Sequence, residues 1–415
     1  MNRIVEKKYI NLLVFLCSAV YFVSYITRIN YGAVLVEIIA DKGITKAAAS
    51  LVVTGSSITY GVGQLISGYL GDKVKPHLLI AWGLITTALM NLLFPFCSYG
   101  MMIAAWCVNG LAQAMMWPPM VKILTQYLGS EQYKRNCVKI SWSSSLGTIA
   151  VYLFAPFIIG ASGWKGVFFY SGIAAAIMTV ILLVSIGRIT SHTEDVEEEV
   201  QAISDKVKNT SGIKPILPVL AIAAVGIILQ GILRDGITTW MPTYISDTYN
   251  LGSRVAILTG VVLPIFSIIC HQLASVIYTS FIRNEFICSA VIFAVAFVAS
   301  AILTASGSTS AVLSVILSAV VTGCMHGVNL ILICMIPAYF EKYGKVSLIS
   351  GFLNSCTYIG AAISTYGMAV VSDNFGWNAT IAMWAVVALV GVIVCISGSR
   401  KWKKFKKQSI KELSN

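Results

Sequence analysis

The chain has 415 residues, of which 57% are hydrophobic and only 11% are charged, and its formal net charge is +12. This composition excludes a water-soluble globular domain and is typical of an integral membrane protein. The excess of basic residues does not indicate nucleic-acid binding, because most of them lie in connections and chain ends rather than in one polar domain.

Apolar stretches of about 20 residues recur along the chain, and each is long enough to cross a bilayer as a helix. The alternating pattern of a membrane β-barrel is absent, so we expect an all-α integral membrane protein. Twelve transmembrane helices are predicted, in two six-helix bundles with pseudo-two-fold symmetry. The predicted spans are 9–38, 46–70, 77–97, 100–128, 136–160, 164–188, 214–246, 255–281, 284–306, 310–340, 346–372 and 377–399.

One long polar stretch, 189–213, divides the spans into two sets of six. Its acidic run is typical of a solvated linker. The predicted domains are therefore an N-terminal bundle at 1–188, a cytoplasmic linker at 189–213, a C-terminal bundle at 214–399 and a basic cytoplasmic tail at 400–415.

The positions of lysine and arginine predict the orientation of the chain. Only Lys42, Lys46, Lys165 and Arg254 fall on the side that is external when both termini are cytoplasmic. Cytoplasmic loops of membrane proteins carry an excess of Lys and Arg. We expect a multi-pass protein of the cytoplasmic membrane, with a tail that rests on an anionic leaflet.

The two halves of the sequence resemble each other. Gly163-Trp164 opens the sixth span and Gly376-Trp377 opens the twelfth. A six-plus-six repeat is the layout of transporters that bind their substrate at the bilayer midplane between the halves. The sequence therefore favours a transporter built from two homologous bundles.

Arg28 lies deep in the first span, where a charge costs about 2.5–3.5 kcal/mol on insertion scales. Tyr21, Tyr25 and Arg28 recur at helical spacing and so share one face of the helix. A guanidinium beside phenols suits an oxyanion, because its planar donors match phosphate or carboxylate oxygens. Pairing of Arg28 with an internal carboxylate is the alternative, and Asp235 is the one deep acid in the predicted spans.

Arg234 occupies the matching place in the seventh span. Gln230 lies one helical turn before it on the same face, and Gly236 and Pro242 allow the helix to bend near the site. Asp235 is adjacent in sequence, so we expect its side chain to point about 100° away and not to bind the same ligand. A partner on another span and proton uptake are the two roles open to Asp235.

Two further segments carry candidate functional residues. Trp117 precedes a pair of prolines that interrupts the fourth span, and Lys122 in the same span either extends to the cytoplasm or contacts substrate. Gly68, Asp72 and Lys73 end the second span, where a carboxylate and cations at a helix end favour one conformation of the cytoplasmic side.

Four runs together resemble one family, the organophosphate:phosphate antiporters of the major facilitator superfamily, which includes glycerol-phosphate and hexose-phosphate transporters. These runs are YITRINYGA at 25–33, YGVGQLISGYLGDKVKP at 60–76, NGLAQAMMWPP at 109–119 and LRDGITTWMPTY at 233–244. The resemblance implies an exchanger that opens alternately to each side of the membrane. It also implies that the loop at Gly68, Asp72 and Lys73 is the G-x-x-x-D-[RK] loop of major facilitator proteins.

The resemblance implies roles for individual residues. Arg28 and Arg234 match the two arginines that bind the phosphoryl group in this family. The same pocket includes tyrosines that match Tyr21, Tyr25 and Tyr358, and His326 stands where the family has a tyrosine.

The chain also departs from the family pattern. Gln64 stands where the family often has a lysine, and no histidine occurs in the fifth span, near Ser145 or Leu146. The predicted pocket is therefore less positive, which makes a monovalent carboxylate a stronger competitor of a phosphoryl group. His326 is open to two interpretations, a cation when protonated or a neutral hydrogen-bonding residue, and His271 is expected in packing or at the rim.

The sequence therefore predicts a secondary active transporter that exchanges a phosphorylated metabolite for inorganic phosphate. Two alternatives stand beside it: a proton-coupled symporter of a carboxylate such as a sugar acid, with Asp235 or His326 as the titrating group, and a transporter-like sugar-phosphate sensor. We expect a monomer in the lipid bilayer with no nucleic-acid partner. The ten scattered cysteines form no metal-binding pattern and no phosphate loop is visible, so neither an enzyme nor a cofactor or metal is expected.

Overall fold

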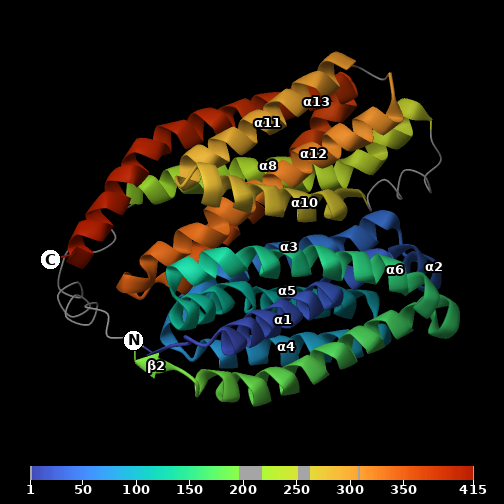
Figure 1. Ribbon diagram of the computed structural model, residues 1–415. Coiled ribbons are helices and arrows are strands. Elements are labelled where there is room, and N and C mark those ends of the chain that lie inside the picture. Colours follow the sequence, from blue (N-terminus) through green and yellow to red (C-terminus); the bar gives the residue numbers. More distant parts are fainter. Residues whose placement is uncertain (1, 196–216, 251–261, 307–308, 415) are drawn as a thin grey trace. The chain divides into compact units, whose positions relative to one another are not determined.

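The computed structural model describes residues 2–195, 217–250, 262–306 and 309–414 (Figure 1). The chain clusters into two compact units. Unit 1 is Met1–Glu197 with Pro337–Ser355, and unit 2 is Glu198–Ile336 with Cys356–Asn415. Most of the predicted linker, the predicted external Arg254 and the beginnings of the predicted seventh and eighth spans lie outside the described residues.

Unit 1 is built from helices that follow the first six predicted spans. Its helices are α1 (Lys7–Ala33), α2 (Leu35–Lys42), α3 (Lys46–Lys73), α4 (Pro76–Leu93), the 3-10 turn η1 (Phe94–Phe96), α5 (Tyr99–Ala114) and α6 (Trp117–Thr190). Two short strands, β1 (Asn2–Arg3) and β2 (Glu194–Asp195), pair antiparallel beside them. The first predicted span is divided between α1 and α2 at Val34.

Backbone breaks in and before α6 separate the predicted fourth, fifth and sixth spans. Gly129 and Gly163 have φ values of 72° and 70°, which are left-handed conformations that favour glycine. The fourth span is itself interrupted, because α5 ends at Ala114 and α6 begins at Trp117. The paired prolines therefore fall in the first turn of a helix, where their missing N–H groups are not needed.

Unit 2 contains the helices of the second half. They are α8 (Leu217–Tyr249), α10 (Val262–Val276), the π-helical turn η3 (Ile277–Phe281), α11 (Glu285–Ser306), α12 (Ala311–Asn329), the π-helical turn η4 (Leu330–Met335) and α13 (Val346–Ser414) from residue 356 onward. Gly376 breaks α13 with φ 78°, at the Gly-Trp pair that predicted the start of the twelfth span. The 3-10 segment η5 (Ile336–Tyr343), from Pro337 onward, and α13 as far as Ser355 cluster with unit 1 instead.

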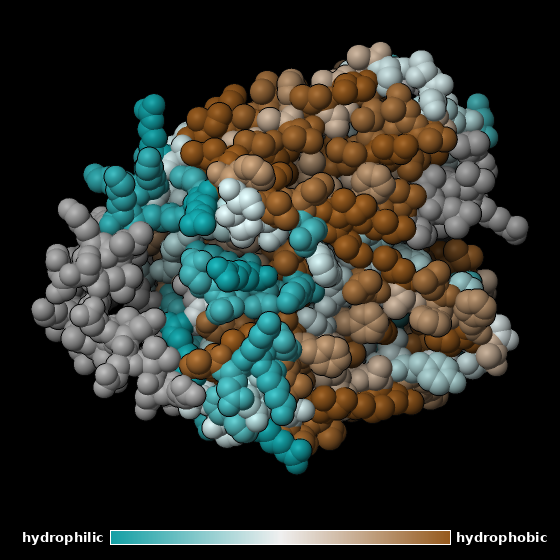
Figure 2. Space-filling view, viewed as in Figure 1, coloured by the Kyte–Doolittle hydropathy of each residue, from teal (hydrophilic) through white to brown (hydrophobic). Residues whose placement is uncertain are grey.

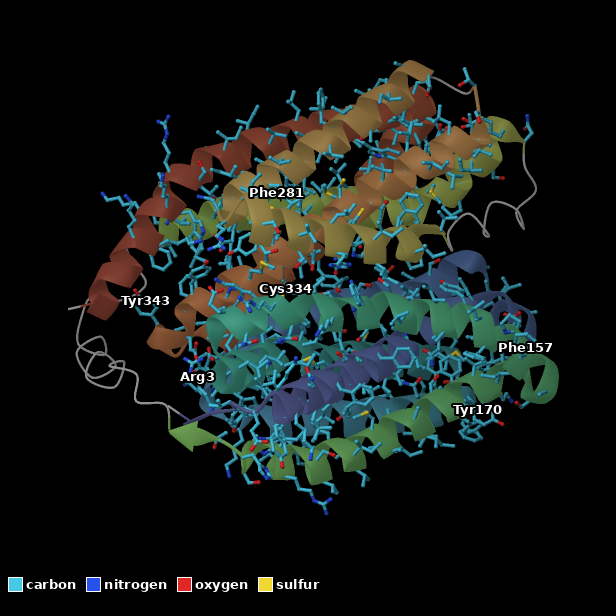
Figure 3. All side chains as sticks on the ribbon, viewed as in Figure 1. Arg3, Phe157, Tyr170, Phe281, Cys334 and Tyr343 are labelled. Carbon is cyan, nitrogen blue, oxygen red and sulfur yellow. The ribbon has the colours of Figure 1, made fainter. Side chains whose placement is uncertain are left out.

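The described residues include nine helical stretches that are long and apolar enough to span a membrane. The predicted second and fourth spans are not among them, since α3 carries many polar residues and α5 has only 16 residues. Large apolar side chains such as Phe157, Tyr170 and Phe281 are exposed and point away from their helices (Figure 3). In Figure 2 the visible face of each unit is mostly hydrophobic, and hydrophilic side chains gather where β2 and the end of α13 lie.

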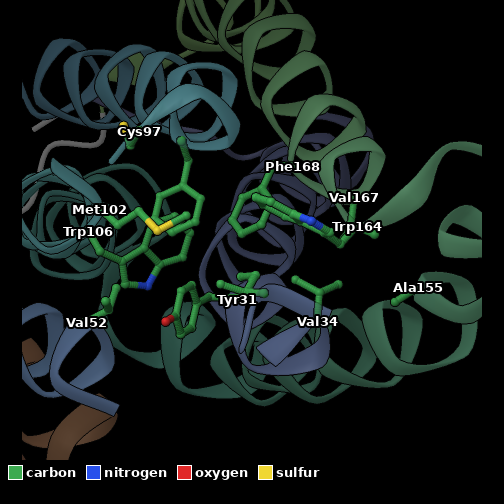
Figure 4. Close-up of a cluster of buried hydrophobic side chains, with 12 residues drawn as sticks. Tyr31, Val34, Val52, Cys97, Met102, Trp106, Ala155, Trp164, Val167 and Phe168 are labelled. Carbon is green, nitrogen blue, oxygen red and sulfur yellow. The ribbon is translucent and has the colours of Figure 1, made fainter. Parts of the chain in front are cut away.

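An aromatic cluster forms part of the buried core of unit 1 (Figure 4). The Phe94 ring stacks on Phe168 with centroids 4.5 Å apart and meets Trp106 edge-on at 4.8 Å. Tyr31 of α1 is fully buried against both Phe94 and Trp106. The cluster therefore joins α1, η1, α5 and α6 through residues far apart in the sequence.

A buried carboxylate holds the basic C-terminal segment against unit 2. Glu285 is fully buried and accepts hydrogen bonds from Tyr278 Oη at 2.5 Å and Trp402 Nε1 at 2.5 Å. Lys406 Nζ lies 3.1 Å from Glu285 Oε2 and forms an ion pair with it. The predicted tail is thus the continuous end of α13, docked by one tryptophan and one lysine.

Candidate anion-binding residues

Arg28 lies among aromatic rings in unit 1. Its Cζ atom is 4.1 Å from the ring centroid of Tyr60 on α3 and 5.8 Å from that of Tyr25 on α1. A guanidinium over the face of a ring is attracted to its negative quadrupole, and the attraction grows when the pair is shielded from water. Tyr60 was not singled out in the sequence, although it precedes Gln64 by one helical turn and so shares its face of α3.

The predicted tyrosine stripe is present and extends to Trp117. Tyr21 and Tyr25 meet edge-on with centroids 5.2 Å apart, and Tyr21 lies 5.0 Å from the Trp117 ring. Trp117 is buried, and its indole N–H has no hydrogen-bond partner within the described ranges. Unit 1 thus places Arg28 beside one phenol of its own helix, Tyr25, and one of α3, Tyr60, with the Trp117 indole at the far end of the stripe.

Gln64 is fully buried, and neither its amide oxygen nor its amide nitrogen has a hydrogen-bond partner among the residues that the structure describes. A buried amide without partners costs about 1–3 kcal/mol. This residue stands where the family resemblance has a lysine, so the position supplies a neutral polar group instead of a charge.

A ladder of buried polar side chains fixes α1 next to α4 and α5. Ser24 Oγ donates to Gln113 Oε1 at 2.6 Å, and Gln113 Nε2 donates to Thr27 Oγ1 at 2.8 Å. Asn30 Nδ2 donates to Asn91 Oδ1 at 2.7 Å. These residues flank Arg28 in sequence, so the ladder sets the rotation of α1 and the direction in which the arginine emerges.

Arg234 in unit 2 is bonded to its sequence neighbour, contrary to expectation. Its Nε donates to Asp235 Oδ1 at 2.8 Å and its Nη2 donates to Asp235 Oδ2 at 2.9 Å. The prediction that Asp235 points away from Arg234 is therefore wrong. The Cβ directions of adjacent residues do diverge, but the long arginine side chain folds back and presents its planar fork to the carboxylate.

Gln230 holds α8 against two other helices. It is fully buried, its Nε2 donates to the carbonyl of Met325 at 3.2 Å, and its Oε1 accepts from Thr357 Oγ1 at 3.5 Å. The amide is thus engaged by α12 and α13. These bonds support the segment of α8 one turn before Arg234.

Two imidazoles lie together near Arg234. The rings of His271 on α10 and His326 on α12 have centroids 5.3 Å apart, and the charge of Arg234 acts electrostatically on both. His271 is buried, with Nδ1 2.7 Å from the carbonyl oxygen of Ser267. His271, expected in packing or at the rim, is packed against His326. Tyr358 also belongs to unit 2, half-buried on α13.

Asp72 caps the beginning of α13 in unit 1. Its Oδ1 accepts from the backbone N–H of Ser347 at 3.1 Å, and its Oδ2 accepts from that of Leu348 at 2.8 Å. A carboxylate at a helix N-terminus satisfies free N–H groups and the positive end of the helix dipole. Burial raises the pKa of Asp72 above its ordinary value, and the two N–H bonds and the charge of Lys122 oppose that effect.

Glycine allows the close approach that this cap requires. A Cβ on Gly68 would lie 2.8 Å from the carbonyl oxygen of Ser347, and a Cβ on Gly71 would lie 2.1 Å from Ser347 Oγ. Lys73 does not contribute to the cap. Its ammonium group bonds the Tyr69 hydroxyl and lies 4.1 Å from the Tyr69 ring centroid.

Other contacts bind the 337–355 segment within unit 1. Lys134 Nζ lies 3.7 Å from the ring centroid of Tyr339, and Arg3 Nη2 lies 3.6 Å from Glu341 Oε1. Arg3 and Tyr343 are labelled near this end of unit 1 in Figure 3. Lys122 Nζ donates to the Gly71 carbonyl at 2.8 Å, which supports the end of α3 beside the Asp72 cap.

The described residues contain no group of three or more His, Cys, Asp or Glu side chains that could hold a metal ion. The ten cysteines are free thiols. The candidate residues carry guanidinium, phenol, imidazole and amide groups, which are able to bind an oxyanion through charge and hydrogen bonds.

Comparison with known proteins shows the superfamily to which the chain belongs. The family model of the Major Facilitator Superfamily matches residues 17–333, and the chain belongs to this superfamily. The fold is also that of the proton:xylose symporter XylE, with a TM-score of 0.76, 12% identity, and coverage of 94% of this chain and 95% of the other. The chain is thus a multi-pass membrane transporter of the twelve-helix fold predicted from its sequence.

Curated relatives narrow the group within the superfamily. A probable hexose phosphate transport protein of Chlamydia muridarum is 23% identical over 90% of this chain and 87% of its own length. The glycerol-3-phosphate transporter of Bacillus subtilis is 23% identical over 89% of this chain and 87% of its own. The membrane sensor protein UhpC of Salmonella typhimurium is 21% identical over 91% of this chain and 88% of its own length. The resemblance to organophosphate:phosphate antiporters is confirmed, and these relatives are not enzymes.

Proposed function

We propose that the protein moves a small phosphorylated metabolite across the cytoplasmic membrane in exchange for inorganic phosphate. Arg28 of unit 1 and Arg234 of unit 2 bind the anion, and both chain termini are cytoplasmic. The proposal rests on the guanidinium of Arg28, held 4.1 Å from the Tyr60 ring centroid inside a helix bundle. A charge is rarely placed at this depth without a ligand or a partner to justify its cost.

The relatives support the choice of a phosphorylated substrate. Two of them are named for hexose phosphate and glycerol-3-phosphate, and each aligns over about nine-tenths of this chain. The superfamily match at residues 17–333 includes Arg28 and Arg234, which lie in the runs that resemble the family. A phosphoryl group offers three oxygens to the planar donors of a guanidinium, so it is bound with better geometry by arginine than by lysine.

Exchange requires that the loaded carrier changes access more readily than the empty one. An anion that contacts both arginines screens their mutual repulsion, and its differential affinity for the closed arrangement drives the change. The ion pair of Arg234 with Asp235 lowers the repulsion in the empty carrier. Substrate binding must then rearrange this pair as well as bridge the two arginines.

The proposed mechanism also depends on the contact between Asp72 and the 337–355 segment. The 337–355 segment packs within unit 1, yet both of its ends continue into helices of unit 2. In the proposed cycle this segment leaves the end of α3 when access changes, which breaks the bonds from Ser347 and Leu348 to Asp72. The glycines of α3 allow it to pack again without a steric barrier.

The proposal predicts that transport depends on a counter-anion. Purified protein in liposomes should take up radiolabelled phosphate when the vesicles are loaded with phosphate, and uptake should fall at least tenfold with empty vesicles. Uptake into empty vesicles that responds only to an imposed pH gradient would contradict exchange. That result would support a proton-coupled symporter instead, with Asp235 or His326 as the titrating group.

A sensor is the second candidate, because the UhpC relative is named a membrane sensor protein. A sensor needs ligand binding but not turnover. Measuring phosphate binding and phosphate exchange on the same preparation separates the two: a transporter turns over many phosphates per protein, whereas a sensor binds phosphate with little or no exchange.

A further inference from the structure

The contact between α3 and the first turns of α13, both within unit 1, contains buried polar side chains that have no hydrogen-bond partner in the described part of the chain. They are the amide of Gln64 and the hydroxyls of Ser67, Ser347 and Ser350, and each of these residues is at most 1% exposed. Buried polar groups in native proteins are almost always bonded, so each exception requires a physical explanation.

The two helices approach each other through their backbones at this contact. A Cβ on Gly351 would overlap the carbonyl oxygen of Gln64 and would lie 2.9 Å from the Cα of Gly68. Glycine is therefore required on both sides of the contact, because no side chain fits between the two backbones.

Helical spacing places the serines on the facing surfaces. Ser67 lies four residues before Gly71, and a Cβ on Gly71 would overlap Ser347 Oγ. Ser350 follows Ser347 by three residues and so lies on the same side of α13. The polar groups therefore lie on the surfaces that the contact buries.

Other buried serines of unit 1 bond a carbonyl of their own helix. Ser141 Oγ donates to the Cys137 carbonyl at 3.0 Å, and Ser171 Oγ donates to the Val167 carbonyl at 2.7 Å. Within the described ranges the three serines of the contact make no such bond. Their hydroxyls lose water when the contact closes and gain no hydrogen bond in return, which makes closure less favourable.

We infer that these four polar side chains make the contact between α3 and the start of α13 easy to open: each loses water when the contact closes and regains it when the contact opens. The inference rests on the proposed function, in which the 337–355 segment leaves α3. It deepens that function by naming the residues that set how readily the segment leaves.

Two opposing effects then act on the closed contact. The Asp72 carboxylate stabilises it by accepting hydrogen bonds from the backbone N–H groups of Ser347 and Leu348. The unpartnered amide and hydroxyl groups destabilise it. A carrier that alternates between two conformations needs them close in free energy, and a contact with favourable terms alone would hold one of them.

Hydrogen–deuterium exchange of the purified protein in detergent tests the inference at Leu348. The Leu348 N–H bonds Asp72 Oδ2 at 2.8 Å, so its protection factor measures how rarely the contact opens. The test variant leaves Asp72 and Gln64 unchanged and removes three hydroxyls together through Ser67→Ala, Ser347→Ala and Ser350→Ala.

The matched control removes the same number of hydroxyls from unit 2. These hydroxyls are also fully buried and have no partner among the described residues, and the substitutions are Ser289→Ala, Ser300→Ala and Ser318→Ala. The control therefore separates a general effect of removing buried hydroxyls from an effect on the α3 contact.

The test variant should raise the protection factor of Leu348 at least about tenfold, because its closed contact no longer buries unbonded hydroxyls. The control variant should keep the wild-type protection factor at Leu348, even if its unfolding temperature rises. Ser350→Ala alone should raise the protection factor about threefold, and it decides the test if the triple variant does not fold.

A protection factor of Leu348 in the test variant that equals or falls below that of wild type would overturn the inference. An equal rise in the control variant would overturn it as well. The measurement needs no transport, so it is separable from the proposed function. If wild type exchanges no phosphate while the protection factor rises as expected, the proposed function fails and the easily opened contact stands. Phosphate exchange with an unchanged protection factor has the opposite meaning.

Discussion

At the scale of single residues, the polar ladder of α1 determines how Arg28 is presented. Asn91 is its centre: its Oδ1 accepts from Asn30, and its Nδ2 donates to the carbonyls of Thr87 at 2.9 Å and Thr27 at 3.3 Å. All of these side chains are fully buried, so a lost bond is not replaced by water. The ladder is therefore part of the binding apparatus, although it is not expected to touch the substrate.

Asn91→Ala should lower the stability of unit 1 by about 1–2 kcal/mol, because hydrogen bonds between membrane helices contribute about 0.6–2 kcal/mol each. Thermal unfolding in detergent measures the change, and the variant should unfold at a lower temperature than wild type. Thr54→Ala is the matched control, since the exposed Thr54 hydroxyl bonds only the Ser50 carbonyl of its own helix among the contacts described. Equal unfolding temperatures for the two variants would contradict the claim that the ladder stabilises unit 1.

Sequence spacing predicted part of the candidate site. The stripe of Tyr21, Tyr25 and Arg28 follows from helical periodicity and is present. Tyr60 could not be paired with Arg28 in advance, because the contact joins two helices and depends on tertiary packing. The bond between Arg234 and Asp235 was missed for a different reason. The rule for adjacent helical residues describes the directions of their Cβ atoms, and a long arginine side chain can fold back toward a neighbour whose Cβ points elsewhere.

At the scale of elements, backbone breaks were more predictable than helix ends. The Gly-Trp pairs predicted breaks at Gly163 and Gly376, and both glycines have positive φ. The break at Met115 and Met116 follows from the prolines after Trp117. The π-helical turns η3 and η4 have no signal in the sequence, since neither segment contains glycine or proline.

The contact between α3 and the start of α13 leads to a test by cross-linking. A Cβ on Gly71 would lie 3.0 Å from the Ser347 Cβ, and a disulfide needs about 3.5–4.5 Å, so Gly71→Cys with Ser347→Cys should join after a small shift. Oxidation should then abolish phosphate exchange, because the 337–355 segment must leave α3 in each cycle. A reductant should restore exchange.

The single variants Gly71→Cys and Ser347→Cys are the controls, and neither should lose exchange on oxidation. Mass spectrometry of tryptic peptides establishes that the disulfide has formed. Full exchange by the cross-linked protein would show that the segment stays on unit 1 throughout transport.

At the scale of the whole molecule, the hydropathy of the sequence was enough to predict the fold class. The twelve-helix fold follows from apolar stretches of membrane length, and the superfamily match agrees with it. The division of the chain into two units was harder to predict from the sequence than the fold class. The sequence groups 337–355 with the second bundle, whereas the structure groups this segment with the first 197 residues through Asp72, Lys134 and Arg3. These contacts cross more than 200 positions and leave no local pattern.

The central claim is that one arginine from each half binds the transported anion. Equilibrium binding of radiolabelled phosphate to purified wild type, Arg28→Lys and Arg234→Lys tests it most directly, with Arg188→Lys at an exposed position as the control. Each of the two substitutions removes the planar fork but keeps the positive charge, so we predict that phosphate binds at least about tenfold more weakly, a loss of about 1.4 kcal/mol. Arg188→Lys should bind as wild type does. Phosphate binding of wild-type strength by either Arg28→Lys or Arg234→Lys would contradict the account.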